Sequence, residues 1–388
     1  METFPKKLTS KLSKREVENT VRSLPLLNNL IDLSSNDYLG FAANETIYSN
    51  TFKLILQKEA SQNGATGSRL LTGNHPLYTE LEEYLTHFYA CESTLVFNSG
   101  YDANLGFFSS VPQKGDIIFY DEFIHASIRD GISLSDAKSY KFKHNDLKDL
   151  RDKASRMVQK NRLSQNEPIE VYMVTESVFS MDGDSPDIEA LVKFCEKQGY
   201  RVVIDEAHAV GVFGSGGQGL VQQMKLQKKI FARIVTFGKA MGCHGAAILG
   251  CEKLKEYLLN FSRSFIYTTA LPPHTLATAY SAFEYLSDKG KEPRMRLAEN
   301  IVFFNKKIQA LNLDQFFIPS ISAIHCCLIP GNTRVKKLAK KIQDKGFNIR
   351  PILSPTVREG EERLRFCLHS YNSKEELGLV LQLLSSYI

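Results

Sequence analysis

The chain has 388 residues, of which 43% are hydrophobic and 23% are charged. This balance excludes a disordered chain and predicts two or three globular domains with a large core. The net charge is only +5, so a nucleic-acid-binding role is not indicated. No apolar run reaches the roughly 18 residues that a membrane span needs, and the N-terminus lacks the apolar stretch of a secretory signal.

The cysteines form no Cys-x-x-Cys pair, which zinc sites and redox dithiols usually contain. We therefore expect no metal site, and we expect buried, reduced thiols in a cytoplasmic protein. The seven are Cys91, Cys195, Cys243, Cys251, Cys326, Cys327 and Cys367.

The N-terminal third begins with a polar segment of helical spacing over residues 1–30, which includes Arg15 and Arg22. Residues 31–40 predict a short strand and a turn, and residues 64–73 a glycine-punctuated loop. Apolar residues recur at steps of three and four over 76–90 and predict a helix.

Short apolar runs rich in β-branched residues then alternate with helical segments, as in an α/β protein. They lie at 93–97, 116–120, 170–175, 201–205, 234–237 and 246–250. Because both faces of each run are apolar, we expect strands of a mainly parallel sheet covered on both sides. Functional groups in such sheets gather at the carboxyl ends of the strands.

The C-terminal part is expected to form a smaller α+β domain after one long helical stretch over 273–310. Its predicted strands are 323–329, 348–353 and 363–367, and its predicted helices are 333–345 and 374–387. We place the domains at 1–43 (an N-terminal segment of the small domain), 44–288 (large) and 289–388 (small). The polar stretch 138–166 is interpreted as a solvated surface helix rather than a binding patch; its basic residues are Lys143, His144, Lys148, Arg151, Lys153, Arg156, Lys160 and Arg162.

Two strand ends carry residues with catalytic potential. Asp205 ends an apolar strand and precedes His208 by three residues. A carboxylate there could stabilise a protonated partner, or it could cap a helix. Lys239 follows another apolar strand that ends near Thr236. Desolvation would favour its free amine, which can attack a carbonyl, although an ordinary surface lysine is the alternative.

Two further features lie at strand-to-helix junctions. Gly100 and Tyr101 follow the strand at 93–97, and free amides at a helix start bind anions. His125 follows the strand at 116–120, where a structural histidine is the alternative to a catalytic one. An anion site, an aromatic ring, an acid and a reactive lysine are together what pyridoxal phosphate (PLP) requires.

The chain resembles the α-oxoamine synthases, a PLP-dependent family with the aspartate aminotransferase-like fold (fold type I). The matching motifs are 33–40 (LSSNDYLG), 67–73 (GSRLLTG), 174–184 (VTESVFSMDGD), 205–208 (DEAH), 236–239 (TFGK) and 266–273 (IYTTALPP). The resemblance implies that Lys239 links to PLP, that Asp205 keeps the ring nitrogen protonated, and that His125 stacks on the ring near the incoming thioester.

The resemblance also implies the remaining roles. His208 and Ser180 would bond the cofactor, while Gly100, Tyr101 and Thr236 would hold its phosphate. Thr268 or Thr269 would reach the phosphate of the neighbouring subunit in a homodimer with shared active sites. The positions that hold the substrates are Asn36 and Arg365 for the amino-acid carboxylate, and Arg22 and Thr356 for the acyl chain.

Within the family, 354–357 (SPTV) and 363–365 (RLR) are most similar to the members that condense L-alanine with a pimeloyl thioester for biotin synthesis. The acyl carrier would be CoA or acyl carrier protein. Leu353 stands where these members often have arginine, which bears on acyl-chain specificity. Members that use glycine with acetyl-CoA, or serine with palmitoyl-CoA, remain alternatives.

Two alternatives lie outside the family. One is an α/β binding protein without catalysis, against which the presence of both Asp205 and Lys239 argues. The other is a nucleotide-binding protein that uses the glycines at 214–219, but this stretch lacks the Lys-Ser/Thr ending of a P-loop.

Overall fold

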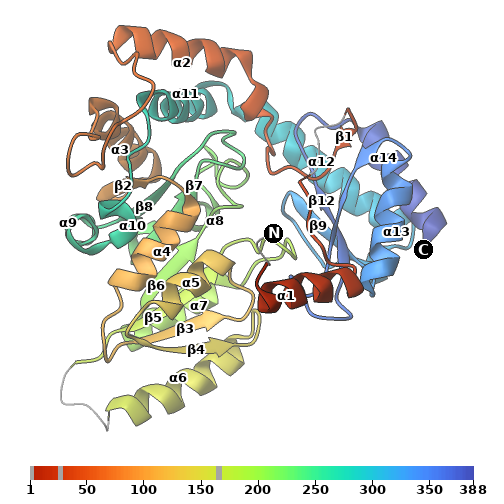
Figure 1. Ribbon diagram of the computed structural model, residues 1–388, viewed down its shortest axis with the longest axis horizontal. Coiled ribbons are helices and arrows are strands. Elements are labelled where there is room, and N and C mark those ends of the chain that lie inside the picture. Colours follow the sequence, from red (N-terminus) through yellow and green to blue (C-terminus); the bar gives the residue numbers. More distant parts are fainter. Residues whose placement is uncertain (1–3, 25–28, 163–167) are drawn as a thin grey trace. The chain divides into compact units, whose positions relative to one another are not determined.

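A computed structural model describes residues 4–24, 29–162 and 168–388, and of residue 162 it describes the backbone alone. The chain forms two compact units (Figure 1). Unit 1 contains residues 1–35, 181–184 and 296–388, and unit 2 contains residues 36–180 and 185–295. Within the described ranges, none of the helices combines the length and the apolar character that a membrane span would need.

Unit 2 is built around a seven-stranded sheet. Its strands are β2 (Ser93–Phe97), β3 (Ile117–Asp121), β4 (Lys138–Phe142), β5 (Val171–Glu176), β6 (Arg201–Asp205), β7 (Ala232–Thr236) and β8 (Ala246–Gly250). Its helices are η1 (Phe41–Ala43), α2 (Glu45–Gln57), α3 (Pro76–Tyr89), α4 (Gly100–Ser110), α5 (Ala126–Ser133), α6 (Leu147–Arg162), α7 (Ile188–Gln198), α8 (Leu220–Gln223), η2 (Gln227–Lys229), α9 (Glu252–Phe261), α10 (Arg263–Ile266) and α11 (Pro273–Lys289).

The strand order is β2-β8-β7-β6-β5-β3-β4. The run from β7 through β4 is parallel, and β8 is antiparallel to both of its neighbours. The predicted α/β class is therefore confirmed, and the six strands expected from apolar runs are present to within two residues at each end.

Alternate side chains of each central strand enter different cores, because side chains of a strand point to opposite faces. In β6, Val203 packs among residues of α4, α5 and α9, whereas Val202 and Ile204 pack among residues of α6 and α7. Helices thus cover both faces of the sheet in unit 2 (Figure 1). This burial explains why the strands are apolar throughout rather than alternating.

The edge strand β4 was missed by the sequence prediction, which assigned 138–166 to one surface helix. Its side chains are mostly exposed, so it lacks the apolar pattern of the central strands. His144 is not on a helix either: it lies between β4 and α6, with its ring 4.5 Å from those of both Phe123 and Phe179. Among the described residues of the stretch only those of α6 are helical, and residues 163–166 lie outside the described ranges.

Unit 1 holds two small sheets. Strands β11 (Arg350–Ile352), β12 (Arg363–Cys367) and β9 (Ile324–Leu328) are antiparallel, and β1 (Ile31–Asp32) pairs in parallel with β10 (Phe347–Asn348). The helices are α1 (Lys6–Val17), η3 (Asp314–Phe316), α13 (Asn332–Gln343) and α14 (Lys374–Tyr387). Helix α12 (Lys291–Ala310) begins in unit 2 and continues into unit 1.

The long helix expected over 273–310 is divided into α11 and α12 at Gly290. Pro293 lies in the first turn of α12, where its missing amide hydrogen leaves no intrahelical acceptor unsatisfied. The pair of Gly290 and Pro293 was the sequence signal for this break.

The seven cysteines are all free thiols. Four of them are buried, as expected, while Cys91, Cys243 and Cys251 are half-buried. In the described part of the chain, no group of three or more His, Cys, Asp or Glu side chains is arranged to hold a metal ion.

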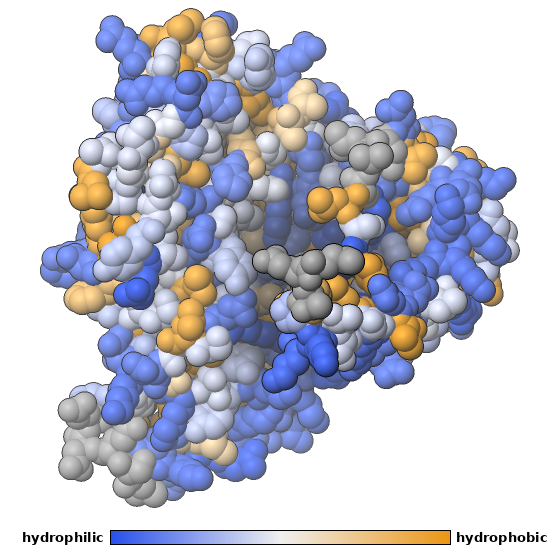
Figure 2. Space-filling view, in the orientation of Figure 1, coloured by the Kyte–Doolittle hydropathy of each residue, from blue (hydrophilic) through white to orange (hydrophobic). Residues whose placement is uncertain are grey.

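Apolar side chains are also found on the outside of unit 2. They gather over α2 at the top of Figure 2, and the large hydrophobic residues exposed on this helix are Tyr48, Phe52 and Leu56. A second exposed set comprises Leu70, Leu71 and Tyr267, on two loops joined by a hydrogen bond from the Ala270 amide to the Gly67 carbonyl (2.9 Å).

Candidate active site

The carboxyl ends of β5, β6 and β7 meet at one edge of the large sheet. Because β5 and β6 are parallel and in register, Glu176 and Asp205 end their strands side by side. Asp205 is in turn paired with Ile234 of β7, two residues before Thr236. The sheet therefore brings two acidic side chains and a hydroxyl to the edge where parallel sheets carry function.

Asp205 is buried, with 7% of its surface exposed. Its Oδ1 accepts a hydrogen bond from the Ala207 amide and its Oδ2 one from Nδ2 of Asn104 on α4, both at 2.9 Å. No helix of the described chain begins at Asp205. The helix-cap alternative is therefore wrong, and the carboxylate is held between its own turn and α4.

Lys239 lies in the turn after β7 and is half-buried, unlike the exposed loop lysine of the alternative interpretation. Burial is the largest influence on the pKa of both His125 and Glu176, and the positive charge of Lys239 acts to lower each of them, so the amine acts on the same edge of the sheet. The carboxyl of Asp205 acts to raise the pKa of these same two groups. The sheet edge thus holds four titratable groups in mutual electrostatic contact.

The start of α4 forms a cradle next to the end of β7. The amides of Gly100 and Tyr101 belong to the first turn and find no acceptor in the described chain, since the Ser99 hydroxyl caps the Asp102 amide instead (3.1 Å). A side chain on Gly100 would come within 3.6 Å of the Thr236 Cβ and hydroxyl. Two free amides, a hydroxyl and an open position are suited to a phosphate.

Thr268 and Thr269 lie beside this cradle in the same unit. The Asn98 amide group donates to the Thr268 hydroxyl (3.0 Å) and to the Thr269 carbonyl (2.7 Å). Asn98 is the second residue before Gly100, so the two threonines are tied to the chain that leads into α4.

His125 caps α5 with its ring. Its Nδ1 accepts from the Ser127 amide (3.2 Å) and lies 2.7 Å from the Ser127 hydroxyl. Burial lowers its pKa, and the charge of Lys239 lowers it further, while Asp205 opposes the shift. The lowered pKa favours a neutral imidazole at this edge of the sheet.

Glu176 was not selected from the sequence, although it lies in a quoted motif. It is fully buried, and its Oε1 accepts from the His125 amide at 2.5 Å. Burial and the neighbouring Asp205 charge raise its pKa to about 8. A glutamate that ends a wholly apolar strand was the available signal, because such a position is expensive for a charge.

His208 is buried and its Nδ1 lies 2.7 Å from the hydroxyl of Tyr38. The same hydroxyl donates to Oδ1 of Asn36 at 3.2 Å. Tyr38 therefore links two predicted site residues within unit 2, and sequence reasoning missed it. Ser180, the last residue of this stretch of unit 2, is half-buried.

The other predicted substrate residues, Arg22, Thr356 and Arg365, belong to unit 1. Arg22 and Thr356 are exposed, and Arg365 is buried on β12 with Nη1 2.9 Å from the Cys367 sulfur. Two residues before it, Arg363 binds the Asp182 carboxylate at 2.5 Å.

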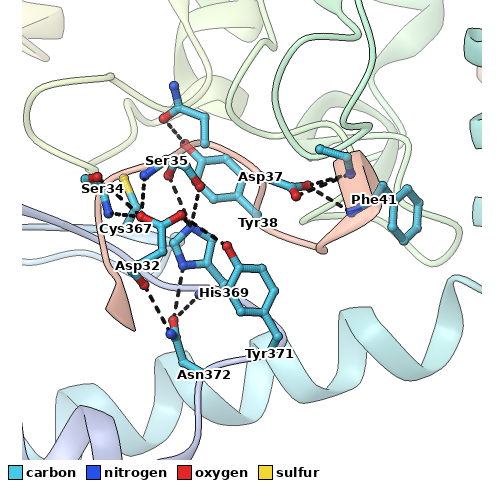
Figure 3. A network of polar contacts seen from close by, with 12 residues as sticks. Asp32, Ser34, Ser35, Asp37, Tyr38, Phe41, Cys367, His369, Tyr371 and Asn372 are labelled. Atoms are coloured by element: carbon cyan, nitrogen blue, oxygen red, sulfur yellow. Dashed lines mark hydrogen bonds and ion pairs between the residues drawn. The ribbon is translucent and has the colours of Figure 1, made fainter. Parts of the chain in front are cut away.

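The segment before Asn36 is anchored in unit 1 by the polar network of Figure 3, in which Asp32, His369 and Asn372 point toward one another. Asp32 Oδ1 accepts from the amides of Ser34 (2.9 Å) and Ser35 (3.0 Å), and His369 lies 3.1 Å from the Ser35 hydroxyl. Burial alone would raise the pKa of Asp32, but these hydrogen bonds and the His369 charge outweigh it and hold it below its usual range.

The glycines at 214–219 do not form a free phosphate loop. The Gly214 amide donates to Gln223 (3.0 Å) and the Gly216 amide to Gln218 (2.9 Å). Two carbonyls of this loop also accept from Arg294. The loop is engaged by its own neighbours, which argues against the nucleotide-binding alternative.

Comparison with known proteins gives consistent findings. The sequence profile of the aminotransferase class I and II family matches residues 28–383. The chain is 38% identical to the 8-amino-7-oxononanoate synthase of Emericella nidulans, over 98% of this chain and 95% of that protein.

Solved structures are also similar. One is a serine palmitoyltransferase from S. paucimobilis with bound PLP, with a TM-score of 0.87 and 25% identity over 98% of this chain and 96% of that one. Another is 8-amino-7-oxononanoate synthase from Francisella tularensis, with a TM-score of 0.76 and 29% identity over 92% of this chain and 97% of that one.

Proposed function

This chain belongs to the aminotransferase class I and II family and, within it, to the α-oxoamine synthases, and on that premise we propose that it makes 8-amino-7-oxononanoate for biotin synthesis. The proposed substrates are L-alanine and a pimeloyl thioester, and the other products are carbon dioxide and the free carrier. The identity to the Emericella nidulans synthase over nearly the whole of both chains supports this assignment.

The residues of unit 2 fit PLP. Lys239 supplies an amine, Asp205 an acid, and the start of α4 with Thr236 supplies a cradle for the phosphate. The observation that carries the proposal is that Asp205 and Lys239 act on the same two groups, the exposed His125 ring and the buried Glu176 carboxyl, at the carboxyl edge of one sheet.

When bound, PLP provides an aldehyde to which amines link and a ring that accepts the electron pair released at the substrate α-carbon. Lys239 Nζ takes the proton from the α-carbon of alanine, since it is the half-buried amine at this edge of the sheet. The Asp205 carboxyl, held by the Ala207 amide and Asn104, would face the ring nitrogen and could accept a hydrogen bond from it.

The other groups orient the reactants. His125 offers a flat, neutral ring to stack against, and His208, fixed by Tyr38, offers an imidazole nitrogen to the phenolic oxygen of the cofactor. Ser180 bonds the cofactor as well. Asn36 and Arg365 hold the alanine carboxylate, and Arg22 and Thr356 line the acyl site.

We further propose a cytoplasmic homodimer with shared active sites, in which Thr268 and Thr269 serve the phosphate of the neighbouring copy. The exposed Leu70, Leu71 and Tyr267 beside these threonines support a subunit contact there. The acyl donor is a thioester of CoA or of acyl carrier protein.

A second candidate is serine palmitoyltransferase, because the structure from S. paucimobilis has a higher TM-score than that of the Francisella synthase. Incubation of the purified protein with alanine, glycine or serine, each with pimeloyl-CoA, palmitoyl-CoA or acetyl-CoA, separates the candidates by product mass. The proposal expects the alanine–pimeloyl product, and a dominant serine–palmitoyl or glycine–acetyl product would contradict it.

Lys239→Ala tests the site itself. The wild-type protein should be yellow, and borohydride should fix the cofactor to a peptide that contains Lys239. The variant should lose both this link and turnover. A fixed cofactor in the variant would refute the lysine assignment, and a colourless wild-type protein would favour a binding protein without catalysis.

A further inference from the structure

A continuous chain of hydrogen bonds runs through the core from Asp205 to His125. Asn104 Nδ2 lies 2.9 Å from Asp205 Oδ2 and 3.1 Å from the Ser127 hydroxyl, and that hydroxyl lies 2.7 Å from His125 Nδ1. Asn104 and Ser127 are 2% and 1% exposed, so the bonds from Asp205 to Asn104 and from Asn104 to Ser127 are shielded from water, while the chain ends on the exposed ring of His125. Neither residue was selected from the sequence.

Close packing of α4 on α5 makes this chain possible. Gly131 lies one turn after Ser127 on α5, and a side chain there would come within 2.9 Å of the Asn104 carbonyl and of the Phe108 Cβ. The glycine lets the two helices approach until Asn104 reaches the Ser127 hydroxyl. The contact is thus a property of the helix pair rather than of one flexible side chain.

One arrangement of the hydrogen atoms pairs every donor in this chain with an acceptor, whereas a proton on His125 Nδ1 would face the Ser127 amide, which is also a donor. The Asp205 carboxylate can only accept, so the Asn104 group that faces it is the NH2 end. This NH2 group also donates to the Ser127 oxygen, which leaves the Ser127 hydroxyl hydrogen for His125 Nδ1. Because the Ser127 amide donates to the same nitrogen, Nδ1 receives two donors and carries no proton.

The unpaired oxygen of Asn104 supports this orientation. Its Oδ1 is buried and has no hydrogen-bond partner in the described chain. An unpaired buried acceptor is unfavourable. The reversed amide, however, would place this oxygen against the Asp205 carboxylate, which is worse because neither atom can donate.

We propose that Asn104 and Ser127 are positioning residues that couple Asp205 to His125 and hold the proton of the neutral imidazole on Nε2. A ring fixed in this way presents an N–H donor rather than a lone pair on its free nitrogen. The proposal adds to the proposed function, since it assigns which nitrogen of His125 can donate a hydrogen bond to a reactant.

Charged groups around His125 come from several elements. Asp205 ends β6, Lys239 follows β7, Asp130 lies on α5, and Glu176 of β5 accepts from the His125 amide. Asn104 and Ser127 are the uncharged groups that connect Asp205 to the His125 ring. Removing the Ser127 hydroxyl deletes a hydrogen bond to the ring, and removing Asn104 deletes the donor to that hydroxyl, while every one of these charges stays in place.

The test is NMR of the cofactor-free protein labelled with ¹⁵N-histidine, with His125 assigned by comparison with His125→Gln. The wild-type ring should carry its neutral proton on Nε2 and titrate below pH 6.5. Ser127→Ala and Asn104→Leu should each raise the protonation constant of His125 about tenfold, the size of one hydrogen bond. If the two residues act through one chain, the double variant should raise the protonation constant of His125 by clearly less than the product of the two single-variant factors.

Ser133→Ala on the same helix is the matched control, because in the described part of the chain its exposed hydroxyl bonds only the Asp130 carbonyl, and it should leave the titration unchanged. A wild-type proton on Nδ1 would overturn the proposal without any variant. So would a double variant whose shift equals the product of the single ones. Since no cofactor or substrate is present, these results are independent of those for the proposed function.

Discussion

The carboxyl group of Glu176 shows how the neighbourhood of one side chain sets its charge. It is buried next to Asp205, and two adjacent buried carboxylates are unfavourable. Its pKa is raised to about 8, so it holds a proton at neutral pH. A neutral carboxyl can fix the His125 amide without adding a second charge opposite Lys239.

Glu176→Gln should therefore change the pH dependence of stability. The folded pKa lies above the ordinary value of 4.5, so the wild-type carboxyl contributes stability below about pH 4.5 that is lost as the pH rises through about 8. The loss approaches about 1.4 kcal/mol per pH unit in this window. The glutamine cannot lose a proton, so urea unfolding of the cofactor-free variant between pH 5 and 9 should show a flatter profile.

Glu170→Gln is the control for this prediction, because Glu170 directly precedes the same strand but is only half-buried and is paired with Arg201. Its profile should follow that of the wild-type protein. If Glu176→Gln retained the wild-type slope, the carboxyl would be ionised in the folded protein and the assignment of its proton would be wrong.

At the scale of single elements, β9 carries a histidine in an apolar core. His325 is 1% exposed, both of its ring nitrogens lack a partner, and its ring packs against Phe304 at 5.0 Å. Burial lowers its pKa to about 3. The strand thus contains a polar ring that makes none of the hydrogen bonds that usually accompany burial.

His325→Leu should stabilise the protein, most strongly in acid. The unfolded histidine binds a proton near its ordinary pKa of 6.5, whereas the folded one does so only near 3. Wild-type stability therefore falls as the pH drops below about 6.5, by up to about 1.4 kcal/mol per unit. Denaturant unfolding between pH 4 and 8 should show a weaker decline for the leucine variant. An equal decline would mean that water or a partner reaches the ring.

Elements were predictable from the sequence where burial on both faces leaves an unbroken apolar run. The strands β2, β6 and β8 begin and end where the sequence predicts. The edge strand β4 was not predictable in this way, since its exposed Lys138, Ser139 and Lys141 resemble the polar helix that follows. The local hydrophobic pattern of a sequence reflects burial, and the side chains of an edge strand are little buried.

The residues of the candidate site also fall into those with a local sequence signal and those without one. Asp205 and Lys239 were selected from the sequence because one ends an apolar strand and the other follows one, which is a local signal. Glu176, Tyr38 and Asn104 were missed because their roles depend on which strand or helix lies beside them. Register between β5 and β6 and the packing of α4 on α5 are tertiary facts that no single segment encodes.

At the scale of the whole molecule, the proposed dimer makes the active site depend on two copies. Thr268 and Thr269 lie beside exposed apolar residues, and the proposal assigns their hydroxyl groups to the neighbouring phosphate. If so, each site needs Lys239 from one copy and the two threonines from the other. A variant that lacks either contribution should be nearly inactive as a homodimer.

Mixing two inactive variants tests this dependence. Lys239→Ala keeps its threonines, and the double variant Thr268→Val/Thr269→Val keeps its lysine, so a hybrid dimer has one site with both contributions. Equal mixing by mild unfolding and refolding makes half of the dimers hybrid, which should restore activity at about a quarter of the sites. If the threonines served their own copy, both sites of the hybrid would be defective and mixing would restore nothing. Refolding each variant alone is the control, since recovered activity must require both chains.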